Sequence, residues 1–427
     1  MGSSMMGRKR LEGFTRFERY EDVLSRLLTR VNTVLESENI AVTESIGRIV
    51  AEDVYSPRNY PPVDRAAVDG YAVRSLDVLS ASPSNPAILK IVGSVEAGET
   101  PRFSVGVGEA AIIFTGAPIP EGSDAVISFE EAFVREGLVY VLRPVQKYKN
   151  VSRAGEDIKV GDLIIKRGSV IRPWHIAALI EAGFTEVKVF RKPRIGIINV
   201  GNELMVGEDS KIPNSTGPLI YAYLRELGCE PALVGVVPDD LEQISDTVLK
   251  VLRDFDILIT TGGTSVGGKD LVPEALSRIS GAELVFHGVN LRPGRTAGAY
   301  LINGKPVLMF SGLPVAALIG LEVFVKPLIK HLTGAKLLPE HTVRVKVRRR
   351  VTNVIGFKSF FRVVVYRENN ELFMEPLRLT GSGIISTLLR GNAILVVDEN
   401  VEGYDEGDYV DVVLIGPIYD ERPEFLE

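Results

Sequence analysis

The stretch DILITTGGTSVGGKD, residues 256–270, decides the fold of the chain around it. An apolar run of the buried-strand type passes directly into a glycine-rich turn, which is typical of the carboxyl end of a strand in an α/β unit. Working outward, RIGIINVG (194–201), PALVGVV (231–237) and PVLMF (306–310) repeat the strand pattern between helical segments. We therefore expect a doubly wound parallel sheet over residues 191–335, with its ligand site at the carboxyl ends of the strands.

The segments on either side of this unit follow other patterns. Apolar residues at three- and four-residue spacing predict an amphipathic helix within 18–36, and Pro173 suits the first turn of another helix. Short β-type runs broken by glycine and proline predict a β-rich unit over 61–146. Five β-type runs within 340–427, two of them joined by the turn ENN, predict a small β-barrel domain at the C-terminal end.

Composition excludes several classes of protein. A length of 427 residues favours about three domains, and the formal net charge of −6 argues against a partner that is nucleic acid. One cysteine and four histidines exclude an intrachain disulfide and a zinc cluster by spacing, which fits a cytoplasmic location. The apolar run 306–325 is long enough to span a bilayer, but Pro314 and Glu322 interrupt it, so we expect a buried strand and helix and no membrane partner.

The glycine-rich turn is the strongest candidate for a site. Successive backbone N–H groups in such a turn can face an anion, and the start of a helix adds a favourable dipole. Asp270 closes the turn and Glu203 follows a neighbouring strand, so both carboxylates converge on one sheet edge. A carboxylate beside an anion site favours a bridging hard cation such as Mg²⁺. A purely structural glycine turn, with Glu203 as an ordinary acid at a helix start, remains the alternative.

Other polar residues are less specific. Arg292 and Arg295 in LRPGR could bind an oxyanion through their guanidinium groups, or could belong to a solvated turn. The alternating basic residues of RVKVRRR share one face of a strand, which is most often a solvated face. The upstream loops offer a scattered set of polar residues that spacing alone does not join into one site: Asp64, Asp69, Thr115 and Asp157.

Taken together and in order, the segments AAVDGYAVR, FTGAPIPEG, AGEDI, GNEL, TGGTSVGGKD, LRPGR, SGLP and TGSG resemble the MoeA family of molybdopterin molybdenumtransferases, which includes the E domain of gephyrin. The resemblance implies an elongated homodimer with four domains in each subunit. The first domain would be discontinuous, from residues 8–60 and 147–190, with domain II at 61–146, a MogA-like domain III at 191–335 and domain IV at 340–427. The active site would lie between two subunits.

The resemblance also implies the chemistry. Such a protein places molybdenum from molybdate, or tungsten from tungstate, on adenylylated molybdopterin and releases AMP, with Mg²⁺ on Glu203 and Asp270. Contact with the adenylyltransferase that supplies this substrate is a further expectation. The catalytic residues would be Asp69, Thr115, Asp157, Glu203 and Asp270. Substrate would be bound by Gly262, Gly263, Thr264, Ser265, Gly267, Arg292, Arg295, Pro314, Arg362 and Ser382.

The chain departs from the family pattern at three motifs. SGLP runs into VAALIG without the usual GNP, RPGRT replaces KPGKP, and SRAGEDI lacks one basic residue. Two alternatives to the transferase stay open. One is an adenylyltransferase, which would consume ATP and whose activity needs only a single domain that bears TGGTS. The other is a scaffold that binds a partner peptide without catalysis.

Overall fold

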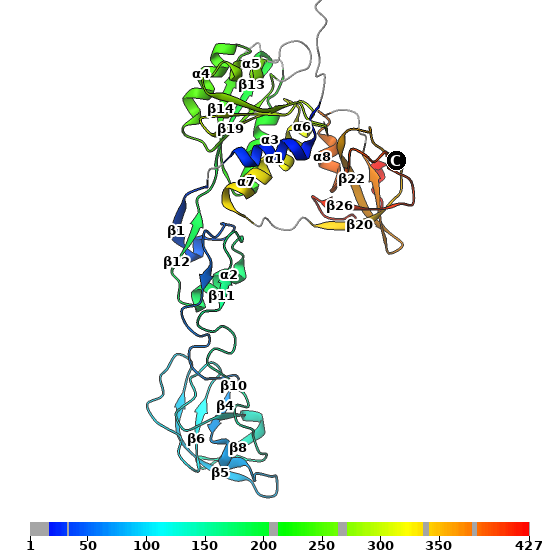
Figure 1. Cartoon of the computed structure of the whole chain (residues 1–427). Coiled ribbons are helices and arrows are strands. Elements are labelled where there is room, and N and C mark those ends of the chain that lie inside the picture. Colours follow the sequence, from blue (N-terminus) through cyan, green and yellow to red (C-terminus); the bar gives the residue numbers. More distant parts are fainter. Residues whose placement is uncertain are drawn as a thin grey trace, which may run out of the picture.

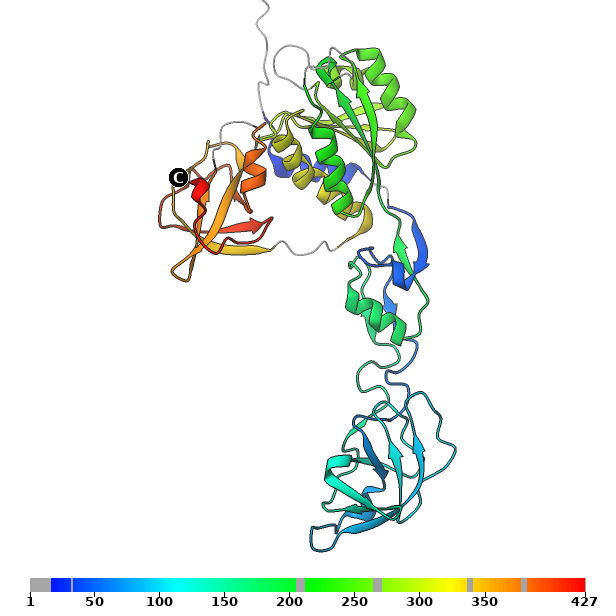
Figure 2. The ribbon, with the colours of Figure 1, turned by 180° about the vertical axis from the view of Figure 1, so that it is seen from behind.

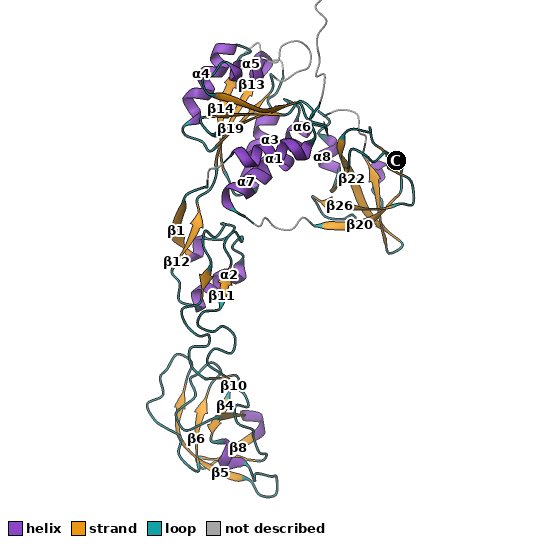
Figure 3. Ribbon diagram, in the orientation of Figure 1, coloured by secondary structure: helices purple, strands orange, loops and turns teal. Residues whose placement is uncertain are grey.

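The computed structural model describes residues 17–31, 34–204, 212–263, 271–335, 341–377 and 382–426. Figure 1 shows an elongated molecule, with an α/β unit beside a C-terminal barrel at one end and a β-sheet unit at the other. A small middle unit connects the two ends. Figure 3 shows that most of the helical structure gathers in and around the α/β unit.

The α/β unit is built on a six-stranded sheet in the order β14-β13-β15-β19-β18-β16. Four neighbouring strands are parallel, but β18 runs antiparallel to both of its neighbours. The expected sheet was parallel throughout; the reason for the difference is the two-residue turn Asn303–Gly304, whose positive φ angles of 51° and 76° suit a tight hairpin. The strands are β13 (Arg194–Val200), β14 (Glu230–Val237), β15 (Ile257–Thr261), β16 (Ala282–His287), β18 (Gly298–Ile302) and β19 (Lys305–Phe310).

Helices cover both faces of this sheet, as a doubly wound fold requires. One face packs on α4 (Leu241–Leu252) and α5 (Leu271–Ser277), and the other on α3 (Thr216–Glu226), α6 (Pro314–Gly320) and α7 (Lys326–Thr333). The N-terminal helix α1 (Tyr20–Arg30) joins the second group through buried Val23 and Leu27, and Figure 2 shows it beside these helices from behind. Its packing therefore belongs to the α/β unit, although the expected boundaries place it in the discontinuous unit 8–60.

The apolar run 306–325 forms β19 and then a helix that contains one π-helical turn, Leu321–Val325, between α6 and α7. Pro327 has no N–H, so it cannot donate to a carbonyl of the preceding turn, and the helix widens there. The hydroxyl of Tyr20 donates to the carbonyl of Val323 at 3.0 Å and thus satisfies a group near this interruption. Among the described residues, none of the helices has the length and apolar character needed to cross a membrane.

We expect Tyr20→Phe to lower the free energy of unfolding by about 1–2 kcal/mol, because the Val323 carbonyl loses a buried hydroxyl donor. Urea unfolding followed by circular dichroism measures this change. Tyr409→Phe is the matched control, since the hydrogen bond from the Tyr409 hydroxyl to Glu371 is exposed. Equal stability of the two variants would contradict the role given to Tyr20.

The middle unit is assembled from two separated chain segments. Strand β1 (Ser37–Ala41) pairs with β12 (Glu186–Phe190), and β2 (Val54–Tyr55) pairs with β11 (Leu163–Ile165). Helix α2 (Pro173–Glu181) begins at Pro173 as expected and packs on a small core that includes Val50, Ile171 and Leu179. Antiparallel pairing across more than a hundred intervening residues keeps both ends of the inserted unit together.

The far unit is the inserted β-sheet, in the order β7-β4-β6-β5-β9-β8. It packs apolar side chains on both of its faces, so a short sheet has two small cores. The pair β3 (Arg65–Ala66) and β10 (Val151–Ser152) closes its near end. The six strands are β4 (Gly70–Val73), β5 (Ala87–Val95), β6 (Glu109–Ile113), β7 (Ala125–Ser128), β8 (Ala132–Arg135) and β9 (Leu138–Val141).

The C-terminal unit is a closed barrel in the order β22-β23-β20-β26-β24, because β24 returns to pair with β22. The predicted turn joins β22 to β23 through Asn369 and Asn370, both with positive φ. A short strand of the α/β unit, β17 (Leu291–Arg292), pairs in parallel with β22 and connects the two units. The remaining bounds are β20 (Thr342–Val347), β21 (Val351–Thr352), β22 (Lys358–Glu368), β23 (Glu371–Pro376), α8 (Ser386–Arg390), β24 (Ala393–Val397), β25 (Gly403–Tyr404) and β26 (Tyr409–Leu414).

Candidate functional site

The carboxyl ends of the parallel strands form a rim in which backbone segments approach closely. Gly262 follows β15 with φ of +89°, and a Cβ atom there would lie 2.2 Å from the carbonyl oxygen of Val200. A Cβ on Gly263 would lie 2.7 Å from a methyl group of Val272. The N–H of Gly262 donates to the carbonyl of Phe310 at 3.1 Å, so this amide links the ends of β15 and β19 rather than facing a ligand. These glycines therefore shape the rim, while Thr264, Ser265, Gly267 and Asp270 lie outside the described residues.

Glu203 presents a carboxylate at this rim, on the 3₁₀ turn Asn202–Leu204 after β13. Its oxygens would lie 2.6 and 2.7 Å from a Cβ on Gly201, so glycine is needed beneath it. Glu203 is exposed, and within the described part of the chain no hydrogen bond or ion pair engages its carboxylate. A carboxylate with free oxygens suits a hard cation, but the described residues contain no cluster of three or more metal-ligating side chains.

Asp239 is a second acid at the same rim, and the sequence analysis missed it. The N–H of Asn202 donates to Oδ2 of Asp239 at 3.2 Å, and the N–H of Asp239 donates to Oδ1 of Asn202 at 3.0 Å. This reciprocal pair fixes the loop that carries Glu203. The sequence contains a signal for this acid, since Asp239 lies two residues after β14, much as Glu203 lies three residues after β13.

The loop after β19 completes this side of the rim. The carbonyl of Gly312 accepts a hydrogen bond from the Thr216 hydroxyl at 2.6 Å, and Pro314 is the buried first residue of α6. The N–H of Val315 donates to the carbonyl of Ser382 at 3.0 Å, so a barrel segment is anchored at the start of α6. The structure thus brings Pro314 and Ser382 close to each other.

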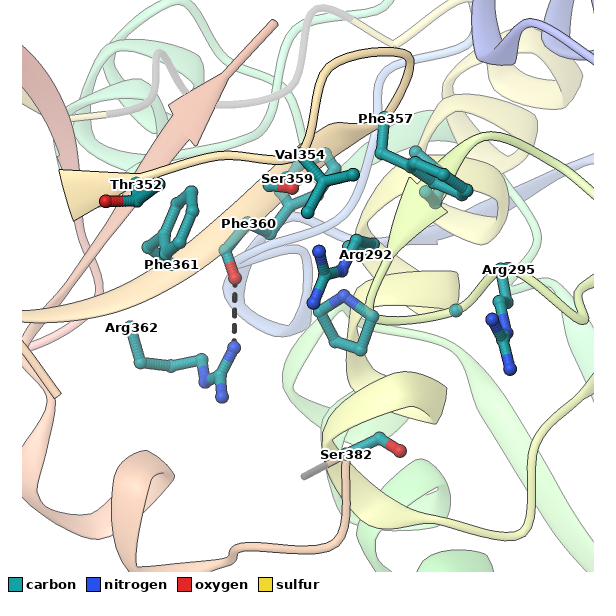
Figure 4. Close-up of a pocket in the computed structure, with 13 residues that line it drawn as sticks. Arg292, Arg295, Thr352, Val354, Phe357, Ser359, Phe360, Phe361, Arg362 and Ser382 are labelled. Carbon is teal, nitrogen blue, oxygen red and sulfur yellow. Dashed lines mark hydrogen bonds between the residues drawn. The ribbon is translucent and has the colours of Figure 1, made fainter. Parts of the chain in front are cut away.

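A cavity of about 600 Å³ lies where β17 meets the barrel, and four of the expected binding residues line it. They come from two units: Arg292 and Arg295 from the loop of β17, and Arg362 and Ser382 from the barrel. Figure 4 shows the guanidinium groups of Arg292 and Arg362 directed toward each other across this space. The remaining lining includes aromatic side chains of β22 and the loop before it.

Arg362 is the unusual member of this set. Its side chain is almost completely buried, at 3 % exposure, yet its hydrogen bonds go to neutral acceptors, the carbonyl of Phe360 at 3.0 Å and the hydroxyl of Thr387 at 3.3 Å. Burial lowers the pKa of this guanidinium. Within the described residues it forms no ion pair with a carboxylate. A buried cation without a counter-charge favours an anionic ligand.

The upstream acids lie in another region. Asp69 precedes β4, and its Oδ1 accepts hydrogen bonds from the N–H and the hydroxyl of Thr115, both at 2.7 Å. These bonds, the one from the backbone first, lower the pKa of Asp69. Oδ1 of Asp64 accepts the N–H of Ala154 at 2.8 Å, which holds the AGEDI loop with exposed Asp157 beside the far unit. Figure 1 places this region well away from the α/β unit, so one chain does not bring Asp69, Thr115 and Asp157 to Glu203.

We expect Thr115→Val to raise the pKa of Asp69 toward its ordinary value, because the variant loses the hydroxyl donor that favours the ionised carboxylate. The Asp69 carboxyl would then take up its proton at a higher pH than in the parent protein. Carbon-detected NMR titration of labelled aspartate measures this directly. An unchanged midpoint would show that the backbone N–H alone sets the pKa.

The basic side chains of β20 form a solvated face, as expected. Lys346 lies 3.7 Å from Glu371, and Arg348 lies 3.6 Å from Glu368. Arg344 is exposed and stands opposite Asp411 in the register with β26. Neighbouring acids therefore balance this face, and it does not form a strong phosphate-binding surface.

Comparison with known proteins assigns these units to recognised regions. Family profiles match in chain order: the MoeA N-terminal region (domain I and II) at residues 18–183, a probable molybdopterin binding domain at 196–331, and the MoeA C-terminal region (domain IV) at 344–415. A molybdopterin molybdenumtransferase of Staphylococcus aureus is 33% identical over 398 residues, which cover 92% of this chain and 94% of the relative.

Archaeal relatives are equally similar. A protein of Methanocaldococcus jannaschii that is named for molybdopterin biosynthesis is 35% identical over 390 residues, which cover 88% of this chain and 92% of the relative. The crystal structure of the molybdopterin biosynthesis moeA protein from Pyrococcus horikoshii OT3 superposes with a TM-score of 0.80 at 33% identity, covering 93% of this chain and 100% of that one. The likeness thus extends over all the units described above.

Proposed function

Since the chain belongs to the MoeA family of molybdopterin molybdenumtransferases, we propose that it transfers molybdenum from molybdate to adenylylated molybdopterin, with magnesium-dependent hydrolysis of the adenylyl bond and release of AMP. The observation that carries the proposal is buried Arg362, which lacks a carboxylate partner among the described residues and lines a cavity together with Arg292, Arg295 and Ser382. Such a cavity suits a dianion. Molybdate and tungstate share this charge and shape, so both are candidate substrates.

The neighbouring rim suits the phosphate end of the second substrate. Gly262 and Gly263 let the backbone segments of the rim pack closely together, and Glu203 offers carboxylate oxygens there that other described groups do not engage. We propose that Glu203 and Asp270 would hold Mg²⁺, which when bound supplies positive charge to phosphoryl oxygens. The Asn202–Asp239 pair holds the loop that carries Glu203 at this rim.

We further propose that a second copy of the chain completes the site. Asp69, Thr115 and Asp157 lie far from Glu203 in one subunit, so a partner subunit would bring them to the rim. Large exposed apolar side chains on the middle unit support an interface there: Tyr55 and Leu163 are partners across β2 and β11, and Trp174 is 62% exposed on α2.

The remaining partners follow from the substrate. We propose that an adenylyltransferase supplies the adenylylated molybdopterin and that the reaction takes place in the cytoplasm. The sequence has one cysteine, Cys229, so an intrachain disulfide is impossible, which supports a reducing location.

The direct test is release of AMP from adenylylated molybdopterin in the presence of Mg²⁺ and molybdate. We expect Glu203→Gln to slow this release by about a hundredfold or more, because a neutral amide neither binds the cation well nor offsets its charge. Glu242→Gln, an exposed acid at the start of α4, is the matched control. Normal release by Glu203→Gln would remove Glu203 from the site, and consumption of ATP without AMP release from the pterin would point to an adenylyltransferase.

A mixing experiment tests the shared site. Asp69→Asn and Glu203→Gln homodimers should each be inactive, but subunit exchange should form mixed dimers with one intact site. If half the dimers are mixed and each carries one working site of two, activity returns to about a quarter of the parent value. Failure to recover activity, in mixtures that form mixed dimers by native mass spectrometry, would refute a site shared between subunits.

A further inference from the structure

The barrel meets the α/β unit at a junction that includes the start of α1. The N–H of Lys358, the first residue of β22, donates to the carbonyl of Asn290 at 2.8 Å. The side chain of Asn290 accepts the N–H of Tyr20 at 2.8 Å, and its own N–H donates to Glu18 at 2.9 Å. Asn290 is 4% exposed. One buried asparagine therefore joins the N-terminal helix, the strand β17 and the barrel.

Ion pairs cross the same junction. Nζ of Lys358 lies 2.8 Å from Glu21 of α1 and 3.0 Å from Asp398 of the barrel, and it also stands over the ring of Tyr20 at 5.4 Å. Arg19 reaches Glu399 of the barrel at 2.8 Å. The Lys358 side chain is only 18% exposed, so water screens its two contacts less than those of a surface pair.

This junction lies directly beside the cavity that is lined by Arg292, Arg295, Arg362 and Ser382. Residues Ser359 to Arg362 of β22 line the cavity, and so does Arg292 at the end of β17, the strand that pairs with β22. The register pairs Leu291 with Lys358 and Arg292 with Ser359, so the positions of the two arginines depend on how β17 and β22 are held together. A displacement of about 1 Å between converging groups is enough to weaken binding or catalysis strongly.

We propose that Lys358, with Glu21 and Asp398, is a positioning cluster that fixes the barrel against the α/β unit so that Arg362 and Arg292 converge on one oxyanion. None of these three side chains lines the cavity. The inference rests on the proposed function for the identity of the oxyanion, but the mechanical role of the cluster is separate from the chemistry of transfer. It also gives the N-terminal helix a part in building a cavity that lies between two later units.

The experiment measures molybdate binding by calorimetry on the full-length protein and its variants. We expect Lys358→Met to weaken binding by about tenfold, and Lys358→Arg to restore most of it, because arginine can still bridge two carboxylates. Lys346→Met removes the same charge from an ion pair on another strand of the barrel and should bind molybdate normally.

A double variant separates positioning from simple attraction between charges. Glu21→Ala/Asp398→Ala removes two negative charges, so attraction through space alone predicts tighter binding of the anion, whereas loss of positioning predicts weaker binding. Weaker binding, together with faster hydrogen exchange of the Lys358 amide, which donates to Asn290 across the junction, supports the inference. Tighter or unchanged binding would overturn it.

The outcomes also separate this inference from the proposed function. If the parent protein binds molybdate and releases AMP while Lys358→Met binds as well as the parent, the positioning role is wrong and the transferase stands. If the parent protein does not bind molybdate, the oxyanion assignment fails for both. In that case unchanged hydrogen exchange in the Lys358 variant would also refute the mechanical role.

Discussion

The proposed anion site depends on Arg362, a buried positive charge that has no counter-charge among the described residues. The guanidinium of Arg362 has exchanged water for a carbonyl and a hydroxyl, which are neutral acceptors and offset only part of the lost hydration. A protein that needed this residue only for packing would lose little by replacing it with an apolar side chain. Retaining the charge makes sense where an anion binds, and the second guanidinium on the opposite wall, from Arg292, increases the potential that an anion would meet.

Because the residues of this chain that would complete the site lie at opposite ends of an elongated molecule, the angle between those ends becomes a functional property. Arg191, at the exit from the middle unit, forms a bidentate ion pair with Asp256 of the α/β unit, with both contacts at 2.7 Å. Burial alone would raise the pKa of Asp256, but the hydrogen bond from Arg191 and the N–H of Arg194 outweigh it, and the pKa is lowered. An ionised, doubly held carboxylate thus holds the chain where it passes from the middle unit into the α/β unit.

The sequence predicts those features that depend on local pattern. The strands of the α/β unit, the helix at Pro173 and the barrel strands lie close to their expected positions, because periodicity and turn residues are local. The alternation of strands and helices predicts a wholly parallel sheet and so gives the wrong direction for β18, which the hairpin turn Asn303–Gly304 reverses. The attachment of α1 to the α/β unit, the convergence of Arg362 with Arg292 and the Asn202–Asp239 pair were beyond prediction from pattern, because each depends on contacts between residues distant in sequence.

The departure from the family motif after β19 changes what the first turn of α6 does. Without the GNP stretch, α6 begins directly at Pro314, and the N–H of Val315 in its first turn donates to the carbonyl of Ser382. An amide that could face an anion at a helix start is therefore used to hold the barrel. In the proposed site the positive charge for an oxyanion would come from side chains, and Arg292 and Arg362 lie on two strands that pair with each other, β17 and β22. The anion site proposed here therefore includes the barrel, because Arg362 and Ser382 line the cavity from that unit.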